Sequence, residues 1–146
     1  MRNMGSNAKK LKEWIEKELM VSDNREELVS VLNSVKERVK NHLRLSKEGS
    51  ITLRPQARKL QKCLQIYLYL IGKAYGYIAE IFDDYDVTNE ELEKKLKLPN
   101  GTVKYCLKEL RDKGWIIPLK PGVHKVDPSR IEEVLDVIDQ EVIGDE

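Results

Sequence analysis

The first third of the chain carries two runs of apolar residues that recur at intervals of three and four. This spacing is typical of amphipathic helices. The members are Leu11, Trp14, Ile15 and Leu19 in the first run, and Leu28, Leu32, Val35, Val39 and Leu43 in the second. Asp23 and Glu26 form a capping pair that would start the second helix. We predict a helical hairpin here, with the polar, aperiodic residues 1–7 frayed.

The next break and the run after it predict a long central helix. Gly49-Ser50 interrupts the pattern, residues 51–53 look extended, and Pro55 fits the start of a new helix. From Gln56 to about Asp83 the apolar residues fall on two stripes, so a helix there must be covered on both faces. Its predicted length is roughly 40 Å at 1.5 Å per residue. We therefore divide the chain at residue 55, with an N-terminal hairpin at 1–55 and a second unit at 56–146.

Two short helices joined by a tight turn follow an acidic segment. Thr88 and Glu91 have the spacing of a capping box for the first of them. The second is predicted from Asn100 to Lys113, and Gly114 stands where a left-handed C-terminal residue is required. The turn between the two helices contains Pro99.

A small β-hairpin and a last helix complete the pattern. Residues 115–118 and 123–126 read as strands, and Lys120-Pro121-Gly122 supplies proline and glycine in the order of a type II turn. Asp127-Pro128 then provides an N-cap and a proline at the first helical position. The apolar residues after it predict a C-terminal helix.

Residues 87–126 resemble the winged helix-turn-helix of bacterial and archaeal transcription regulators. The resemblance rests on Val87–Leu92, Leu98–Lys104 and Leu107–Ile116, and it extends to about residue 60 if the preceding helix belongs to the fold. It implies a mainly α fold in which a helical N-terminal extension precedes a winged helix with a two-stranded wing and a C-terminal helix. It also implies binding to double-stranded DNA, with the 100–113 helix in the major groove. Pro99 departs from the usual small polar residue at the start of that helix.

The spacing of the 100–113 helix supports this interpretation independently. At 100° per residue its apolar residues point inward and leave a basic outer face with one aromatic residue. A short wing adds a few polar side chains. The candidate DNA-binding residues are Asn100, Gly101, Thr102, Lys104, Tyr105, Lys108, Arg111, Lys113, Lys120, His124 and Lys125.

The charge of the chain is strongly segregated, although the formal net charge is only +1. Residues 36–62 hold nine bases and two acids, and residues 94–125 hold the same numbers. Residues 80–93 hold seven acids and no base, and residues 126–146 hold eight acids and one base. A nearly neutral protein can therefore carry a basic face, and this local field is what attracts phosphate.

The remaining chemistry-bearing residues give little sign of a metal site or a reaction. Cys63 and Cys106 lie far apart in helical patterns, and with His42 and His124 they lack metal-ligand spacing. We expect two buried free thiols in a reducing compartment, the cytoplasm, because no signal arrangement precedes the fold. Charged residues interrupt the apolar run at 63–82, which argues against a membrane span. Nucleophile and phosphate-loop motifs are absent, so we expect no enzyme activity, no cofactor and no metal.

The leading hypothesis is a DNA-binding transcription regulator that forms a homodimer through residues 8–82. Two alternatives stay open. The winged helix could be a protein-interaction module in a larger assembly, since fold does not fix function. The protein could also be a chromatin-like or plasmid-maintenance protein that binds DNA with little specificity, for which residues 36–62 would form a second contact surface.

Overall fold

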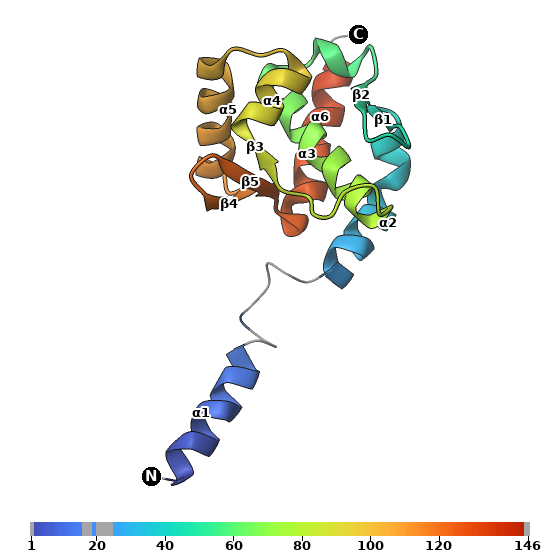
Figure 1. Ribbon diagram of the computed structural model, residues 1–146. Helices are drawn as coiled ribbons and strands as arrows, with labels where there is room; N and C mark the ends of the chain where they lie inside the picture. Colours follow the sequence, from blue (N-terminus) through green and yellow to red (C-terminus); the bar gives the residue numbers. More distant parts are fainter. Residues whose placement is uncertain (1, 16–18, 20–24, 145–146) are drawn as a thin grey trace.

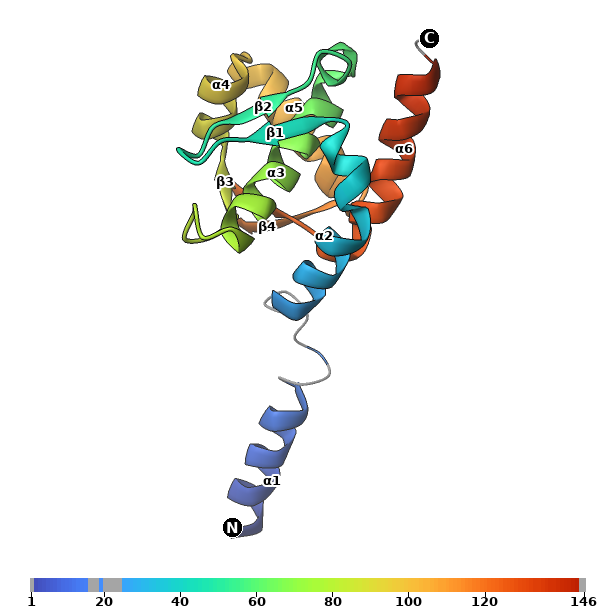
Figure 2. The ribbon, with the colours of Figure 1, turned by 90° about the vertical axis from the view of Figure 1, so that its right-hand side faces the viewer.

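The computed structural model describes residues 2–15, 19 and 25–144 (Figure 1). The predicted capping residue Asp23 lies outside them. The first helix, α1 (Arg2–Trp14), lies away from the rest of the protein in both Figure 1 and Figure 2. Leu11 and Trp14 on it are 57% and 52% exposed. The predicted packing of a hairpin is therefore wrong, and so is the expectation that residues 2–7 are frayed.

The second helix, α2 (Arg25–Lys40), buries the predicted apolar stripe. The predicted helix extends to Leu43, whereas α2 ends at Lys40 and Leu43 begins a strand. Strands β1 (Leu43–Leu45) and β2 (Ile51–Leu53) pair antiparallel, with Leu43 opposite Leu53. Gly49 adopts a φ of 93° in the turn between them, a conformation that favours glycine.

The central helix, α3 (Lys62–Ile78), is shorter than predicted, with 17 residues or roughly 26 Å. A separate 3₁₀ turn at Ala57–Lys59 precedes it, and the extended backbone of Leu60 divides the two. At its other end the chain reverses, and the backbone N–H groups of Ile81 and Phe82 donate to the Gly76 carbonyl. The Phe82 ring then occupies the space that a side chain at residue 76 would need. The prediction that both faces of the helix are covered is confirmed, since every residue from 64 to 74 is buried.

The second half of the chain forms a helix-turn-helix followed by a wing. Its elements are β3 (Val87–Thr88), α4 (Asn89–Leu96), α5 (Asn100–Asp112), β4 (Ile116–Lys120), β5 (Val123–Val126), a 3₁₀ turn (Pro128–Arg130) and α6 (Ile131–Gly144). The predicted two-stranded wing is confirmed as the β4–β5 hairpin, and β3 joins it in a sheet of order β3-β5-β4, which the sequence did not predict. The fold is a mainly α winged helix, as predicted.

One core joins the N-terminal and C-terminal parts of residues 25–144. Buried residues of α2, α3, α5 and α6 belong to a single apolar cluster. Polar contacts reinforce the junction of α2 with α6, because Arg38 donates to Asp136 and Asp139 at 2.7 and 2.9 Å. The buried His42 imidazole lies 2.8 Å from the second Asp139 oxygen. Within the described residues no helix is long and apolar enough to cross a membrane.

Candidate nucleic-acid interface

The first helix of the helix-turn-helix is fixed at both ends. The Thr88 hydroxyl accepts a hydrogen bond from the Glu91 backbone N–H at 3.1 Å, which is the predicted N-cap. The Glu91 carboxylate does not complete a capping box. It accepts from the Tyr69 hydroxyl at 2.5 Å and lies 3.3 Å from the Lys73 ammonium, so it ties α4 to α3. Lys97 then takes a left-handed conformation, with φ of 55°, and turns the chain into α5.

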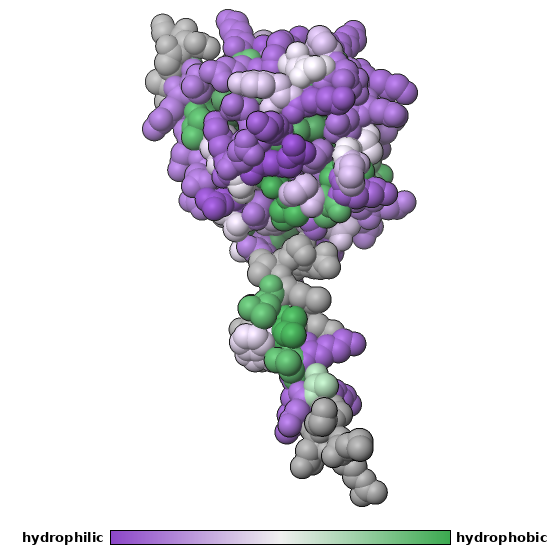
Figure 3. All heavy atoms as spheres, turned by 90° about the vertical axis from the view of Figure 1, so that its left-hand side faces the viewer, coloured by the Kyte–Doolittle hydropathy of each residue, from purple (hydrophilic) through white to green (hydrophobic). Residues whose placement is uncertain are grey.

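The helix α5 has one buried and one exposed face, as its spacing predicts. Its inner side chains, Val103, Cys106, Leu107 and Leu110, are at most 2% exposed and pack towards α3 and α4. Gly101, Lys104, Tyr105 and Lys108 are exposed on the opposite side. This face of the protein is largely hydrophilic in Figure 3.

The start of α5 is open to a partner. Pro99 occupies the N-cap position and its side chain forms no capping hydrogen bond. The first backbone N–H groups of a helix carry positive partial charge and suit an anion such as phosphate. A side chain at Gly101 would meet nothing within 4 Å. Packing inside the protein therefore does not explain the glycine, and the expected close approach of a partner at this position stays a prediction.

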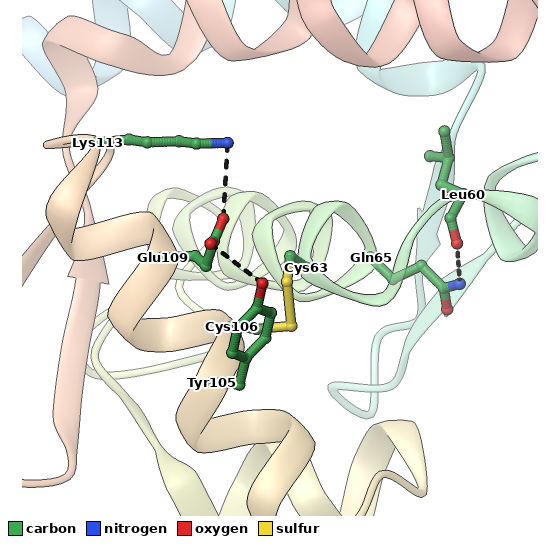
Figure 4. Close-up of a disulfide and its surroundings, with 7 residues drawn as sticks. All are labelled: Leu60, Cys63, Gln65, Tyr105, Cys106, Glu109 and Lys113. Carbon is green, nitrogen blue, oxygen red and sulfur yellow. Dashed lines mark hydrogen bonds and ion pairs between the residues drawn. A yellow bond between two sulfur atoms is a disulfide. The ribbon is translucent and has the colours of Figure 1, made fainter.

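The far half of α5 carries side chains that interact with each other. The Tyr105 hydroxyl donates to Glu109 at 3.2 Å, and the Lys113 ammonium lies 3.9 Å from the same carboxylate (Figure 4). Lys113 also lies 4.7 Å from the centre of the Trp115 ring. The hydrogen bond to Glu109 raises the pKa of Tyr105. Tyr105 and Lys113 must give up these contacts in order to reach DNA, whereas Lys104 and Lys108 need not.

The wing supplies fewer contacts than the sequence predicts. Lys120 is exposed near the tip. His124 and Lys125, however, are only 1% and 6% exposed, so in this structure their predicted role as surface contacts is not supported. The reason is the third strand, because β5 lies between β3 and β4 and His124 is opposite both Val87 and Pro118. Burial, and next the charge of Arg111, lower the pKa of His124.

A disulfide lies behind the exposed face. Cys63 of α3 and Cys106 of α5 are bonded, with their Cα atoms 4.9 Å apart (Figure 4). The prediction of two free thiols is wrong. Two cysteines separated by 43 residues have no spacing that reveals a bond; only the packing of α5 across the start of α3 brings them together.

Sequence reasoning missed three lysines near the turn. Lys94, Lys95 and Lys97 are exposed at the C-terminal end of α4, just before the start of α5. They belong to the basic segment 94–125, so their charge was visible. Their position relative to α5 was not, because it depends on the left-handed turn at Lys97.

Three helices, α3, α4 and α5, precede a β-wing, and the third of them, α5, has a basic exposed face. This arrangement defines this part of the protein as a winged helix-turn-helix. A protein-family model described as winged helix-turn-helix DNA-binding matches residues 78–117, from the last residue of α3 into β4. The match confirms the resemblance over this segment and supports a DNA-binding role for it. Comparisons with curated proteins and with solved structures gave no match.

Proposed function

We propose that the protein is a transcription regulator that inserts α5 into the major groove of duplex DNA at specific sequences. The observation that carries the proposal is the outer stripe of α5. Lys104, Lys108 and Arg111 are exposed, and within the described part of the chain none of them forms an ion pair. They recur at intervals of four and three, so they span about 10 Å along one side of the helix. A major groove roughly 12 Å wide admits a helix with such a stripe.

Salt-dependent titration of duplex DNA tests this surface. Each lysine that contacts a phosphate releases a counterion, so Lys104→Ala and Lys108→Ala should each weaken binding and flatten the salt slope by about one. Lys10→Ala is the matched control, because Lys10 is exposed on α1 and lies outside both basic segments, 36–62 and 94–125. If both α5 variants bind like the wild type, the assignment of α5 as the recognition helix is wrong.

Selection of bound sequences from a random duplex pool tests specificity. Enrichment of one site supports a regulator, whereas equal affinity for unrelated sequences favours a chromatin-like or plasmid-maintenance role. Failure to retard any duplex at low salt would favour the protein-interaction module. We propose no catalytic step for any of these roles.

The homodimer through residues 8–82 stays a proposal. The structure leaves fewer exposed apolar residues to support it than the sequence suggested. Both faces of α3 are covered within the chain, so that helix offers little surface to a partner. The support comes instead from α1, whose Leu11 and Trp14 are exposed, and from Leu19, which is 60% exposed. Figure 3 shows hydrophobic side chains gathered along this part of the molecule. Leu11→Lys should convert a dimer into a monomer in light scattering; an unchanged dimer mass would exclude α1 from the interface.

We place the protein in the cytoplasm, where a DNA-binding regulator works. Disulfides are rare in reducing cytosol, but intracellular proteins of hyperthermophiles are rich in them. The Cys63–Cys106 bond and the charge-rich composition, 35% Asp, Glu, Lys and Arg, both suit such a setting. The mass of the protein alkylated without reductant from its native cells tests whether the bond forms there.

A further inference from the structure

A basic cleft lies beside the C-terminal end of α4. It has a volume of about 410 Å³ and is bounded by β2, the segment before and at the start of α3, and the C-terminal end of α4. Its charged lining residues are Arg58, Lys95 and Lys97, and no carboxylate lines it. Three cations around one hollow repel each other, and an anion would relieve that repulsion.

The backbone and side chains hold Arg58 in place. Its Nε donates to the Leu53 carbonyl of β2 at 3.0 Å, which leaves the terminal amino groups of the guanidinium for a ligand. The buried Gln65 amide donates to the carbonyls of Arg58 and Leu60 at 3.0 and 2.7 Å. Gln65 thereby fixes the segment before α3 onto the helix (Figure 4). The Arg58 guanidinium, held by these hydrogen bonds, therefore lines one side of the cleft.

Two lysines of α4 form the other side. Lys95 and Lys97 are exposed, and neither forms an ion pair within residues 2–15, 19 and 25–144. The left-handed backbone of Lys97 ends α4 at this point. Lysine and arginine side chains around one hollow are the usual ligands of phosphate groups.

We propose that this cleft binds backbone phosphates of the same duplex whose major groove receives α5. The inference rests on the proposed function. Only two residues separate Lys97 from Asn100. Figures 1 and 2 both show the end of α4, the start of α3 and the start of α5 at one end of the protein. Charge continues around the cleft in the exposed side chains of Lys59, Lys62 and Lys94. An extended band of this kind fits a polyanion better than a single small anion, for which a closed set of donors suffices.

Duplexes of two lengths test the proposal. A duplex of about 10 base pairs is one helical turn and covers only the groove that α5 would enter, whereas one of about 24 base pairs extends past it and offers further phosphates to the cleft. The Lys95→Ala/Lys97→Ala protein should bind the long duplex about tenfold more weakly at about 0.1 M salt, with a salt slope flatter by about two. Its affinity for the short duplex should be unchanged. Lys9→Ala/Lys10→Ala removes the same charge from exposed positions on α1, outside the cleft and outside residues 36–62, and should behave like the wild type.

The outcomes separate this inference from the proposed function. If Lys104→Ala weakens binding to both duplexes while the cleft variant binds like the wild type, the cleft inference is overturned and the role of α5 stands. If the cleft variant loses affinity and Lys104→Ala does not, the assignment of α5 fails instead. The last experiment titrates inorganic phosphate into the protein and follows the chemical shift of the Lys97 backbone amide. Saturable shifts without any dependence on duplex length would identify a small-anion site and overturn the duplex proposal.

Discussion

Reduction of the Cys63–Cys106 disulfide should lower stability without moving α5. The bond joins residues separated by 43 positions. In the chain-entropy treatment, a closed loop of that length disfavours the unfolded state by about 4 kcal/mol at 25 °C. The contacts of α5 are otherwise unaffected, because Val103, Leu107 and Leu110 stay buried in the core. We therefore expect a large loss of stability and an unchanged affinity for DNA well below the melting temperature.

Urea unfolding with and without reductant measures this loss. With a slope of about 2 kcal/mol per molar urea, the midpoint should fall by about 2 M on reduction. The Cys63→Ser protein cannot form the bond, so its midpoint should not respond to reductant. Two free thiols in the folded, untreated protein, or equal midpoints in both conditions, would refute the reasoning. A loss of DNA affinity in the folded, reduced protein would show instead that the disulfide, and not the apolar packing, positions α5.

Three further substitutions test the roles of Gly101, His124 and Glu91. Gly101→Ala should stabilise α5 by about 0.5–1 kcal/mol in thermal unfolding, yet weaken duplex binding roughly tenfold because the methyl group obstructs close approach; unchanged affinity would contradict this contact. Since burial lowers the pKa of His124, the unfolded imidazole gains a proton near pH 6.5 while the folded one stays neutral. Stability should thus fall below pH 6.5 by up to about 1.4 kcal/mol per pH unit, and His124→Gln should flatten this dependence; equal slopes would exclude His124 as its source. Glu91→Gln breaks the pair with Lys73 and should cost about 2 kcal/mol in chemical unfolding, below the 3–5 kcal/mol of a fully buried pair; a cost no larger than that of the exposed Glu90→Gln would refute this.

The parts of the helix-turn-helix that depend on neighbouring residues could be predicted from the sequence. Thr88 caps α4 because its hydroxyl needs only the N–H three residues on. Gly114 and Gly122 have φ of 74° and 79° because helix ends and tight turns demand that conformation locally. The buried stripe of α5 follows from its helical period alone.

The parts of the structure that depend on contacts between distant residues could not be predicted from the sequence. Strand β3 has two residues, too few to show an alternating pattern, yet it makes β5 central and buries His124. The end of α3 depends on Phe82 packing against Gly76, a contact that no helical period encodes. The Glu91 carboxylate leaves its expected capping role because Lys73 and Tyr69 lie within reach on another helix.

Two of these long-range contacts attach the helix-turn-helix to the core, and this arrangement bears on the proposed function. The disulfide reaches α5 at Cys106 on its buried face, and Glu91 ties the preceding helix to α3. Both contacts therefore hold the helix-turn-helix from the side of the core. Lys104 and Lys108 form no ion pair within the described residues, so in the proposed complex their side chains would not have to break internal ion pairs to meet phosphate. The buried face of α5 is held rigidly, and the lysines of its exposed face form no internal ion pairs. This lowers the entropy cost of binding, because only the exposed side chains lose freedom when the interface forms.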